Sequence, residues 1–392
     1  MLDFNYYTPT NVHFGRTAEE KIGPVLKGAG ATRVLIHYGS ERVRKSGLLD
    51  KIEASLESAG LTHIALGGVE PNPKIKLVRE GIELCKKEKV DYLLAVGGGS
   101  AIDSTKSISM GLAMGRDPWE LICGQIMPDK HFPFAVVSTM AAAGSEMSNS
   151  HVISDGEQKQ KKALNHDLLR PDFAFMNPEN TYTTPPFETA CGIVDIMMHT
   201  LERYLTIETD TDLTDRLSEA LLKSVKIAGE TVMSNPEDYE ARATLLWASA
   251  LSHNGLTGCG KEQKFSVHKI GHAFSGVFDR IAHGAGLSVL FPAWAQYVYK
   301  YDVRKFARLA TEVFDVPYDY DNPEKTAYKG IFVMKSFFAS LGMPVTMSDL
   351  DLTPADYESI VNVTTVNGTV TVPSYQPLTK EDILNIYKLA ES

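Results

Sequence analysis

The pattern that most limits the possible folds is a regular alternation of short β-rich runs with helical runs over the first 185 residues. Strands are predicted at 33–38, 62–66, 91–96 and 134–139, and helices at 46–58 and 75–88. Strands that alternate with helices form βαβ units, and such units produce a mostly parallel sheet. The first part of the chain is therefore predicted to be an α/β domain of the nucleotide-binding type.

The character of the sequence changes at the Pro185-Pro186 break. Long helical patterns follow it, at 188–204, 212–234, 239–253, 265–277, 285–300 and 324–341. Further helices are expected to start near Thr353 and Thr379, and a strand is conceivable only at 369–372. The prediction is a two-domain chain, with an α/β domain at 1–185 and an all-helical domain at 186–392. A cleft between two such domains is the expected place for a ligand.

Composition excludes several classes of function. The 392 residues carry a formal net charge of -10, whereas a general nucleic-acid binder usually presents a basic face. No apolar run approaches the ~20 residues of a membrane helix, and the first ten residues do not resemble a secretory signal. The four cysteines are scattered without a CxxC pair, which is typical of reduced thiols. We expect a cytoplasmic protein with neither a nucleic-acid nor a membrane partner.

Two loops are candidates for binding a phosphate group. Gly97-Gly98-Gly99 follows a predicted strand and opens a helix, so the backbone N–H groups at that helix end could point at an anion. Residues 139–146 follow the next strand with small and hydroxyl-bearing side chains. Each stretch taken alone also fits a simpler interpretation: a tight βα turn without a ligand for the first, and a closely packed helix start for the second.

The helical part contains a constellation that is typical of a metal site. Asp195 and His199 lie four residues apart, which places both on one face of a helix, and His268 and His272 repeat that spacing. His283 follows shortly after. A single histidine on an apolar face is usually a core residue, but this set is harder to explain that way. One aspartate with three histidines suits Fe²⁺ or Zn²⁺, with nickel, cobalt or manganese possible, and disfavours calcium and magnesium.

Glu202 lies three residues beyond His199, on nearly the same helix face. It could orient a metal ligand from behind. A surface ion pair is the interpretation that the sequence favours. His253, near a helix end, is interpreted as a bystander.

These features together resemble the iron-containing, or group III, alcohol dehydrogenases, specifically the butanol dehydrogenase-like subgroup. The resemblance covers the whole chain and is carried by residues 11–15, 71–73, 97–103, 144–146, 185–186, 192–199 and 268–287. It implies a Rossmann-like α/β domain followed by an all-α domain, in the arrangement of the dehydroquinate synthases.

The resemblance also implies a set of site residues. The metal ligands would be Asp195, His199, His268 and His283, with His272 beside the metal as a candidate proton relay. The cofactor would contact Gly98, Gly99, Ser100 and Asp103 in the glycine loop, and also Asn72, Thr139 and Lys162, where a lysine run leaves the register open. Residues 140–143 lack the usual Gly and Thr, and the spacing from His268 to His283 is one residue longer than usual.

The end of the first strand bears on the choice of nicotinamide cofactor. NAD-preferring relatives tend to carry an Asp there, whereas this chain has Gly39 and Ser40, with Glu41 close by. An acid would repel a 2′-phosphate and small polar residues tolerate it, so the sequence predicts a preference for NADP(H) over NAD(H).

The implied reaction is hydride transfer between NAD(P)(H) and a small primary alcohol or aldehyde, such as butanol or butanal. A homodimer or a larger homo-oligomer is expected. Two alternatives remain open: an enzyme like glycerol dehydrogenase or dehydroquinate synthase, or a metal-stabilised assembly module. A lyase with an anionic substrate would need several basic residues around the metal, and the sequence offers mainly Lys269 and Arg280.

Overall fold

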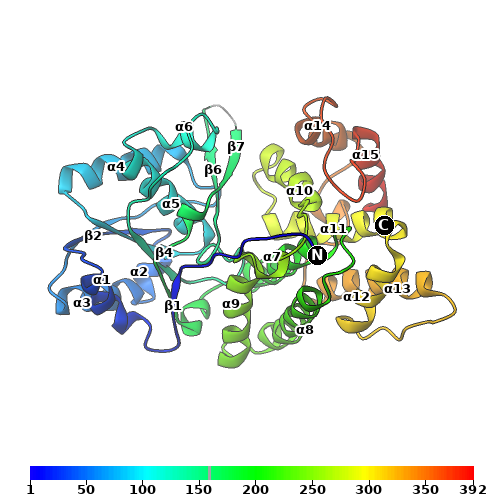
Figure 1. Cartoon of the computed structure of the whole chain (residues 1–392), viewed down its shortest axis with the longest axis horizontal. Helices are drawn as coiled ribbons and strands as arrows, with labels where there is room; N and C mark the ends of the chain where they lie inside the picture. Colours follow the sequence, from blue (N-terminus) through cyan, green and yellow to red (C-terminus); the bar gives the residue numbers. More distant parts are fainter. Residues whose placement is uncertain (158–159) are drawn as a thin grey trace. The chain divides into compact units, whose positions relative to one another are not determined.

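Figure 1 shows the computed structural model of the chain, which describes residues 1–157 and 160–392. Contacts divide the chain into two compact units. The α/β unit consists of Tyr7–Thr184 and Glu237–Asn254, and the helical unit consists of Met1–Tyr6, Pro185–Pro236 and Gly255–Ser392.

The division differs from the predicted boundaries in two places. Helix α9 (Tyr239–His253) was predicted to lie in the helical domain, but its contacts place it in the α/β unit. Its residues Leu246 and Ala250 are buried in the hydrophobic core of that unit. The first six residues, in turn, belong to the helical unit. A helical period in a sequence shows that a helix has a buried face, but not which core that face joins.

A parallel sheet forms the centre of the α/β unit. Its strands follow the order β1-β8-β5-β4-β2-β3, and each adjacent pair is parallel. A separate antiparallel pair consists of β6 and β7. The strands are β1 (Asn11–Phe14), β2 (Arg33–Tyr38), β3 (Thr62–Leu66), β4 (Tyr92–Gly97), β5 (Phe134–Ser138), β6 (Ser150–Asp155), β7 (Gln160–Asn165) and β8 (Phe173–Met176).

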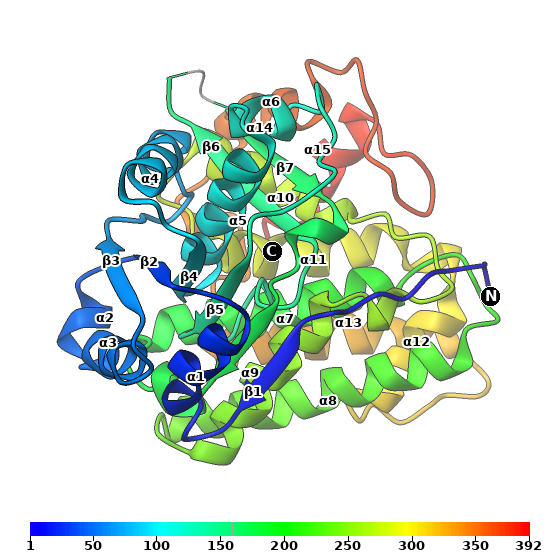
Figure 2. The same ribbon diagram turned by 60° about the vertical axis from the view of Figure 1, so that its left-hand side comes forward.

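Both faces of this sheet are covered by helices, as Figure 2 shows. Successive strand residues alternate between two hydrophobic cores: Leu35 joins α4, α5, α6 and α9, whereas Val34 and Ile36 join α1, α2 and α3. This period of two is why the strands appear as continuous apolar runs in the sequence. The other helices of the unit are α1 (Ile22–Gly28), α2 (Arg42–Lys45), α3 (Leu48–Ser58), α4 (Ile75–Glu88), α5 (Gly99–Met114) and α6 (Pro118–Ile122).

The helical unit is built around two buried helices, α7 and α11. Every residue of α7 from Thr189 to Tyr204 is buried, so this helix packs on all sides rather than along one stripe. Among the described residues, no helix is long and apolar enough to cross a membrane. The helices of the unit are α7 (Pro186–Tyr204), α8 (Asp212–Ser234), α10 (Ser266–Val277), α11 (His283–Val298), α12 (Val303–Glu312), α13 (Pro323–Ser340), α14 (Pro354–Thr365) and α15 (Lys380–Leu389).

The predicted fold class, an α/β unit with a mostly parallel sheet and a helical unit, is confirmed. The conceivable strand at 369–372 is reduced to a single bridge between Val372 and Leu378.

Candidate metal centre and cofactor site

Three helices of the helical unit bring the predicted ligands together. Asp195 and His199 lie one turn apart on α7, His268 lies in the first turn of α10, and His283 is the first residue of α11. Asp195, His199 and His268 are buried and offer ligand atoms within 4.8 Å of one another. His283 is partly exposed, and the centroid of its ring lies 5.3 Å from the centroid of the His268 ring, with the two rings tilted by 54°.

The distances around Asp195 fit a shared cation. Its Oδ1 lies 3.6 Å from Nε2 of His268 and 3.7 Å from Nε2 of His283. His199 lies one turn further along the same helix, and the ligand atoms of Asp195, His199 and His268 lie within 4.8 Å of one another. For metal bonds of 2.0–2.2 Å, the edge of a coordination tetrahedron is about 3.4 Å. The donor atoms of Asp195, His268 and His283 are thus spaced as the corners of one coordination shell.

Two of these donor atoms are buried polar atoms that lack a hydrogen bond. Within the described part of the chain, neither Oδ1 of Asp195 nor Nε2 of His268 has a hydrogen-bond partner. A buried polar atom without a partner is costly, and a buried carboxylate is more so. A divalent cation would satisfy both atoms, so the donor set fits the metal that the sequence predicts.

The unused nitrogens of the ligands are held by neighbouring groups. Nδ1 of His199 lies 2.9 Å from the main-chain oxygen of Asp195, which leaves Nε2 as the electron-pair donor. Nδ1 of His268 is hydrogen-bonded to Glu202. Glu202 is only 3% exposed, so the expected surface ion pair is wrong and its carboxylate lies against a ligand.

The environment of His268 has two opposed effects on its pKa. Burial disfavours the imidazolium and lowers the pKa, but the charge and hydrogen bond of Glu202, together with Asp195, raise it to about 9. A divalent ion binds the neutral imidazole, so metal binding at this residue would release a proton.

A close helix crossing sets the position of His283. At Gly284 a Cβ atom would lie 2.4 Å from the main-chain oxygen of Cys191 and 2.7 Å from its Cα. Only glycine allows α11 to approach α7 this closely. His283 is the residue before this crossing, and Cys191 lies one turn before Asp195 on α7, so the crossing holds the two helices together beside the ligands.

The glycine loop of the α/β unit has the geometry that its sequence predicts. β4 ends at Gly97, whose φ of +154° suits glycine, and α5 begins at Gly99 without a side-chain cap. The first N–H groups of this helix are therefore available to an anion at its N-terminus. Thr139 donates its N–H to the oxygen of Gly97, and a Cβ at Gly98 would contact Met140, so the second loop borders the first.

A buried polar network holds the second loop, residues 139–146, in place. The carboxylate of Asp103 accepts hydrogen bonds from Ser145 Oγ at 2.7 Å and from the N–H of Val152 at 3.0 Å. Lys106, fully buried, donates to Ser145 and to oxygens of residues 148 and 150. Burial lowers the pKa of Lys106 to about 8. Asp103 is thus an anchor for the loop, whereas its predicted contact with the cofactor stays a prediction.

Helix α9 contacts the same loop through two hydrogen-bonding side chains. Ser249 Oγ bonds the main-chain N–H and oxygen of Ala142, and His253 bonds the oxygen of Ala143. Gly144 has a φ of +64°, and a Cβ there would lie 2.2 Å from the oxygen of Ser249. His253, interpreted from the sequence as a bystander, therefore supports the loop.

Two neighbouring lysines on β7 lie on opposite faces. Lys161 donates to Oδ1 of Asn72 at 2.7 Å, and Asn72 sits in a turn with a φ of +56°. Lys162, the predicted residue, instead lies with its Nζ 3.3 Å from Sγ of Cys123 and 5.8 Å from the Trp119 ring. The register left open by the lysine run is resolved in favour of Lys161 as the neighbour of Asn72.

The end of β2 presents the residues expected near the adenosine. Gly39 accepts a hydrogen bond from Gly68 N–H, and Ser40 is exposed. The short helix α2 that follows carries Arg42, Arg44 and Lys45. Arg44 lies 3.8 Å from Glu41, the one acid in this stretch.

A parallel α/β unit with a glycine loop, together with a helical unit bearing one Asp and three His around a point, defines a metal-dependent, nucleotide-binding oxidoreductase. The model of the iron-containing alcohol dehydrogenases matches residues 9–178, and that of the C-terminal part of the same family matches residues 189–390. The chain belongs to the iron-containing alcohol dehydrogenase family, and the predicted resemblance is confirmed.

Named relatives support this assignment. The chain is 37% identical to the probable NADH-dependent butanol dehydrogenase 1 of Bacillus subtilis, over 99% of both chains. It is 32% identical to the NADPH-dependent aldehyde reductase YqhD of Escherichia coli, over 100% of both. The crystal structure of NADH-dependent butanol dehydrogenase A from Thermotoga maritima superposes with a TM-score of 0.95 at 33% identity, covering 100% of this chain and 99% of the other. The chain is an NAD(P)-dependent, metal-dependent oxidoreductase of the alcohol dehydrogenase and aldehyde reductase class.

Proposed function

We propose that the enzyme interconverts small primary alcohols and their aldehydes, of the size of butanol and butanal. The observation that carries the proposal is the clustering of donor atoms around Asp195: its Oδ1 lies 3.6 Å and 3.7 Å from Nε2 of His268 and of His283, and the ligand atoms of Asp195, His199 and His268 lie within 4.8 Å of one another. This is the donor set of a Lewis-acid centre, and the named relatives act on substrates of this kind.

In this proposal the metal is Fe²⁺ or Zn²⁺, held by Asp195, His199, His268 and His283. The ion would polarise the aldehyde carbonyl or favour ionisation of the alcohol, and the nicotinamide would exchange a hydride with the same carbon. The chain's own contribution is to hold the four donors on three packed helices. Because these helices are rigid elements, the four donors would be in place before the substrate binds.

His272 is proposed as the group that moves the proton of the substrate hydroxyl. It lies one turn beyond His268 on α10, and its ring centroid is 5.5 Å from that of His283. An imidazole is suited to this task because it titrates near neutral pH. His272→Ala is expected to lower kcat and to alter its pH profile, and an unchanged profile would remove the relay from the proposal.

The cofactor is proposed to lie along the two loops of the α/β unit. Its pyrophosphate would be bound by the backbone of Gly98, Gly99 and Ser100 at the start of α5. Thr139, Asn72 and Lys161 complete the proposed site. Lys161 replaces Lys162 in this assignment because it is the lysine that bonds Asn72.

We propose that NADPH is preferred over NADH. Gly39 and Ser40 leave room for a 2′-phosphate, and α2 places three cationic side chains directly after them. Glu41 is the opposing charge, and the relatives named above include both NADH-dependent and NADPH-dependent enzymes. The ratio of kcat/KM for the two cofactors decides: a clear preference for NADH would overturn the proposal, and Glu41→Gln should shift the ratio further toward NADPH.

A homodimer or a larger homo-oligomer and a cytoplasmic location complete the proposal. The four cysteines are free thiols, as a reducing compartment allows. Light scattering of the purified protein would determine the assembly state, and a monomer at micromolar concentration would contradict it.

The reaction is tested with enzyme purified without chelator, whose metal content is measured alongside its oxidation of NADPH with butanal. We expect activity that is lost on chelation and restored by Fe²⁺ or Zn²⁺. His268→Ala is expected to lose both metal and activity. A His268→Ala variant with full metal content and full activity would overturn the proposed centre.

The alternative lyase and assembly functions are not favoured. The family models that match both parts of the chain are those of alcohol dehydrogenases. Arg280, one of the two basic residues that the sequence offers, donates to main-chain oxygens of residues 350 and 351. It is therefore committed to packing rather than to an anionic substrate.

A further inference from the structure

Glu202 is a buried carboxylate that the proposed reaction does not use. It lies on α7, seven residues after Asp195 and three after His199, and therefore on the same side of the helix as both. Its side chain is 2% exposed. A carboxylate so deeply buried is costly unless its oxygens are fully engaged.

Glu202 makes its hydrogen bonds to the first turn of α10. Oε1 accepts the N–H of Val267 at 2.6 Å, and Oε2 accepts the N–H of His268 at 3.0 Å. Oε2 also bonds Nδ1 of His268. Helix α10 has no side-chain cap of its own, and its N-cap residue Phe265 has a positive φ of 52°. Glu202 therefore supplies from α7 the cap that α10 lacks.

The same carboxylate determines which nitrogen of His268 is available. Because Nδ1 donates its proton to Glu202, the lone pair of the neutral ring resides on Nε2. Nε2 is the atom that lies 3.6 Å from Oδ1 of Asp195. Glu202 thus fixes both the backbone of His268 and the orientation of its ring.

Glu202 also completes the charge balance of the buried centre. A divalent cation with Asp195 and three neutral imidazoles would carry a net charge of +1. Including the carboxylate of Glu202 brings the sum to zero, and a neutral assembly is the one that burial disfavours least.

We propose that Glu202 is a positioning residue of the metal centre, which presents Nε2 of His268 to the ion and neutralises the ion's remaining charge. The proposal rests on the proposed ligand set. It assigns to one carboxylate a task that otherwise would require a helix cap and a separate hydrogen-bond acceptor.

The test measures metal affinity rather than activity. The full-length protein is stripped of metal, and the Kd for Co²⁺ is measured by competition with a chromophoric chelator, together with the Co²⁺ d–d spectrum. Glu202→Gln removes the charge and leaves a single acceptor for three donors. We expect its Kd to rise 10- to 100-fold and its spectrum to change, as is usual when the group behind a ligand is lost.

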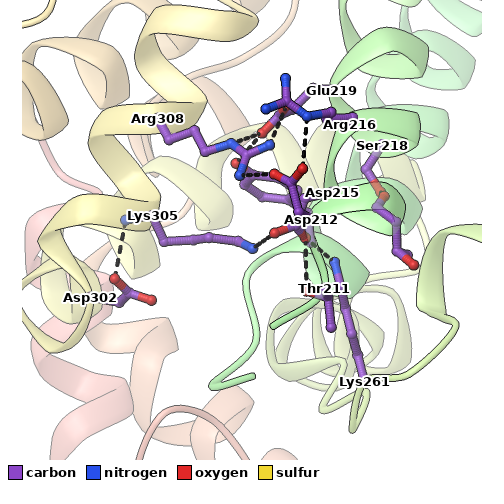
Figure 3. A network of polar contacts seen from close by, with 12 residues as sticks. Thr211, Asp212, Asp215, Arg216, Ser218, Glu219, Lys261, Asp302, Lys305 and Arg308 are labelled. Atoms are coloured by element: carbon purple, nitrogen blue, oxygen red, sulfur yellow. Dashed lines mark hydrogen bonds and ion pairs between the residues drawn. The ribbon is translucent and has the colours of Figure 1, made fainter. Parts of the chain in front are cut away.

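Glu219→Gln is the matched control, because it neutralises another buried glutamate of the helical unit. Glu219 is 5% exposed, and it accepts hydrogen bonds from Tyr204 Oη at 2.7 Å and from Arg308 at 3.0 Å, in the network of Figure 3. Neither Tyr204 nor Arg308 is a proposed ligand. We expect this variant to lose thermal stability while its Co²⁺ affinity and spectrum stay those of the wild type.

A folded Glu202→Gln variant with a Kd within twofold of the wild type and an unchanged spectrum would overturn the proposal. If Glu202→Gln does not fold, Glu202→Asp keeps the charge but withdraws it by one methylene. Its Kd is expected to rise at least fivefold, and wild-type binding would overturn the proposal equally. A wild type that binds no Co²⁺, or a His268→Ala variant that binds it normally, would instead refute the ligand set itself.

Discussion

The crossing of α7 and α11 makes a quantitative prediction about Gly284. A Cβ added there would lie 2.4 Å from the main-chain oxygen of Cys191, whereas ordinary contacts begin near 3.4 Å. The two helices must therefore separate by about 1 Å. Both contacting groups are backbone atoms, so no side chain can rotate away to relieve the overlap.

The metal centre has little tolerance for such a shift. His283 is the residue next to the crossing, and its Nε2 is already 3.7 Å from Oδ1 of Asp195, at the long end of the coordination edge. Displacement by about 1 Å is expected to reduce kcat/KM about 100-fold. Overpacking is expected to lower the free energy of unfolding by about 1–3 kcal/mol.

The comparison with Gly286→Ala isolates this effect. Gly286 lies two residues further along the same helix, and a Cβ there would meet its nearest neighbour, Ile281, at 3.8 Å, an ordinary contact. Steady-state kinetics with butanal and bound metal are measured for both variants. Gly286→Ala should match the wild type, whereas Gly284→Ala should bind less metal and have a lower kcat/KM. Equal kinetics and metal content in the two variants would refute the argument from helix approach.

Three further perturbations test the α/β unit. Gly144→Ala would place a Cβ 2.2 Å from the oxygen of Ser249 at a positive φ, so the Kd for NADPH should rise at least tenfold in fluorescence titrations; an unchanged Kd would contradict the loop assignment. Lys161→Ala should weaken NADPH binding and Lys162→Ala should not, and the reverse result would restore the register predicted from the sequence. Burial lowers the pKa of His37 to about 4 from an unfolded value of 6.5, so its neutral form stabilises the fold above pH 6.5 and this contribution is lost as the pH falls toward 4. In urea unfolding, the stability advantage of wild type over His37→Gln should shrink by up to about 3 kcal/mol between pH 7 and pH 4, and a constant difference would refute this.

The predictability of the fold followed the strength of local periodicity. Strands β2, β4 and β5 are apolar runs because both their faces are buried, whereas the edge strand β3 is only partly buried; each of the four was predicted within a residue or two. Strands β1 and β8 have only four residues each, and β7 is largely exposed, so none has a run long enough to recognise. Helix α12 was missed although its amphipathic pattern is strong, because it follows α11 after only a short turn.

The candidate metal ligands could be predicted because their spacing is local, whereas Glu202 could not be assigned. Asp195 and His199 share a helix face because they are four residues apart, and His268 and His272 repeat that spacing. The choice of His268 and His283 as ligands follows from the resemblance. Glu202 carried one unused signal: it lies seven residues after Asp195 on a helix whose other faces are also apolar. A charged residue in such a helix has no solvent to face, so a buried role was the better inference.

The cofactor side shows a different limit, because its parts are joined through strand register and distant packing. Lys161 and Lys162 must lie on opposite faces of β7, since side chains alternate along a strand. Which of the two contacts Asn72 depends on how the β6–β7 pair packs against the turn that follows β3. That packing is set by contacts such as the hydrogen bond from Ser154 N–H to the main-chain oxygen of Pro73. No local pattern encodes that pairing. The same holds for α9, which supports the second loop although Ala142 and Ser249 are 107 positions apart in the chain. A site assembled from such pairings can be named residue by residue only once the long-range contacts are known.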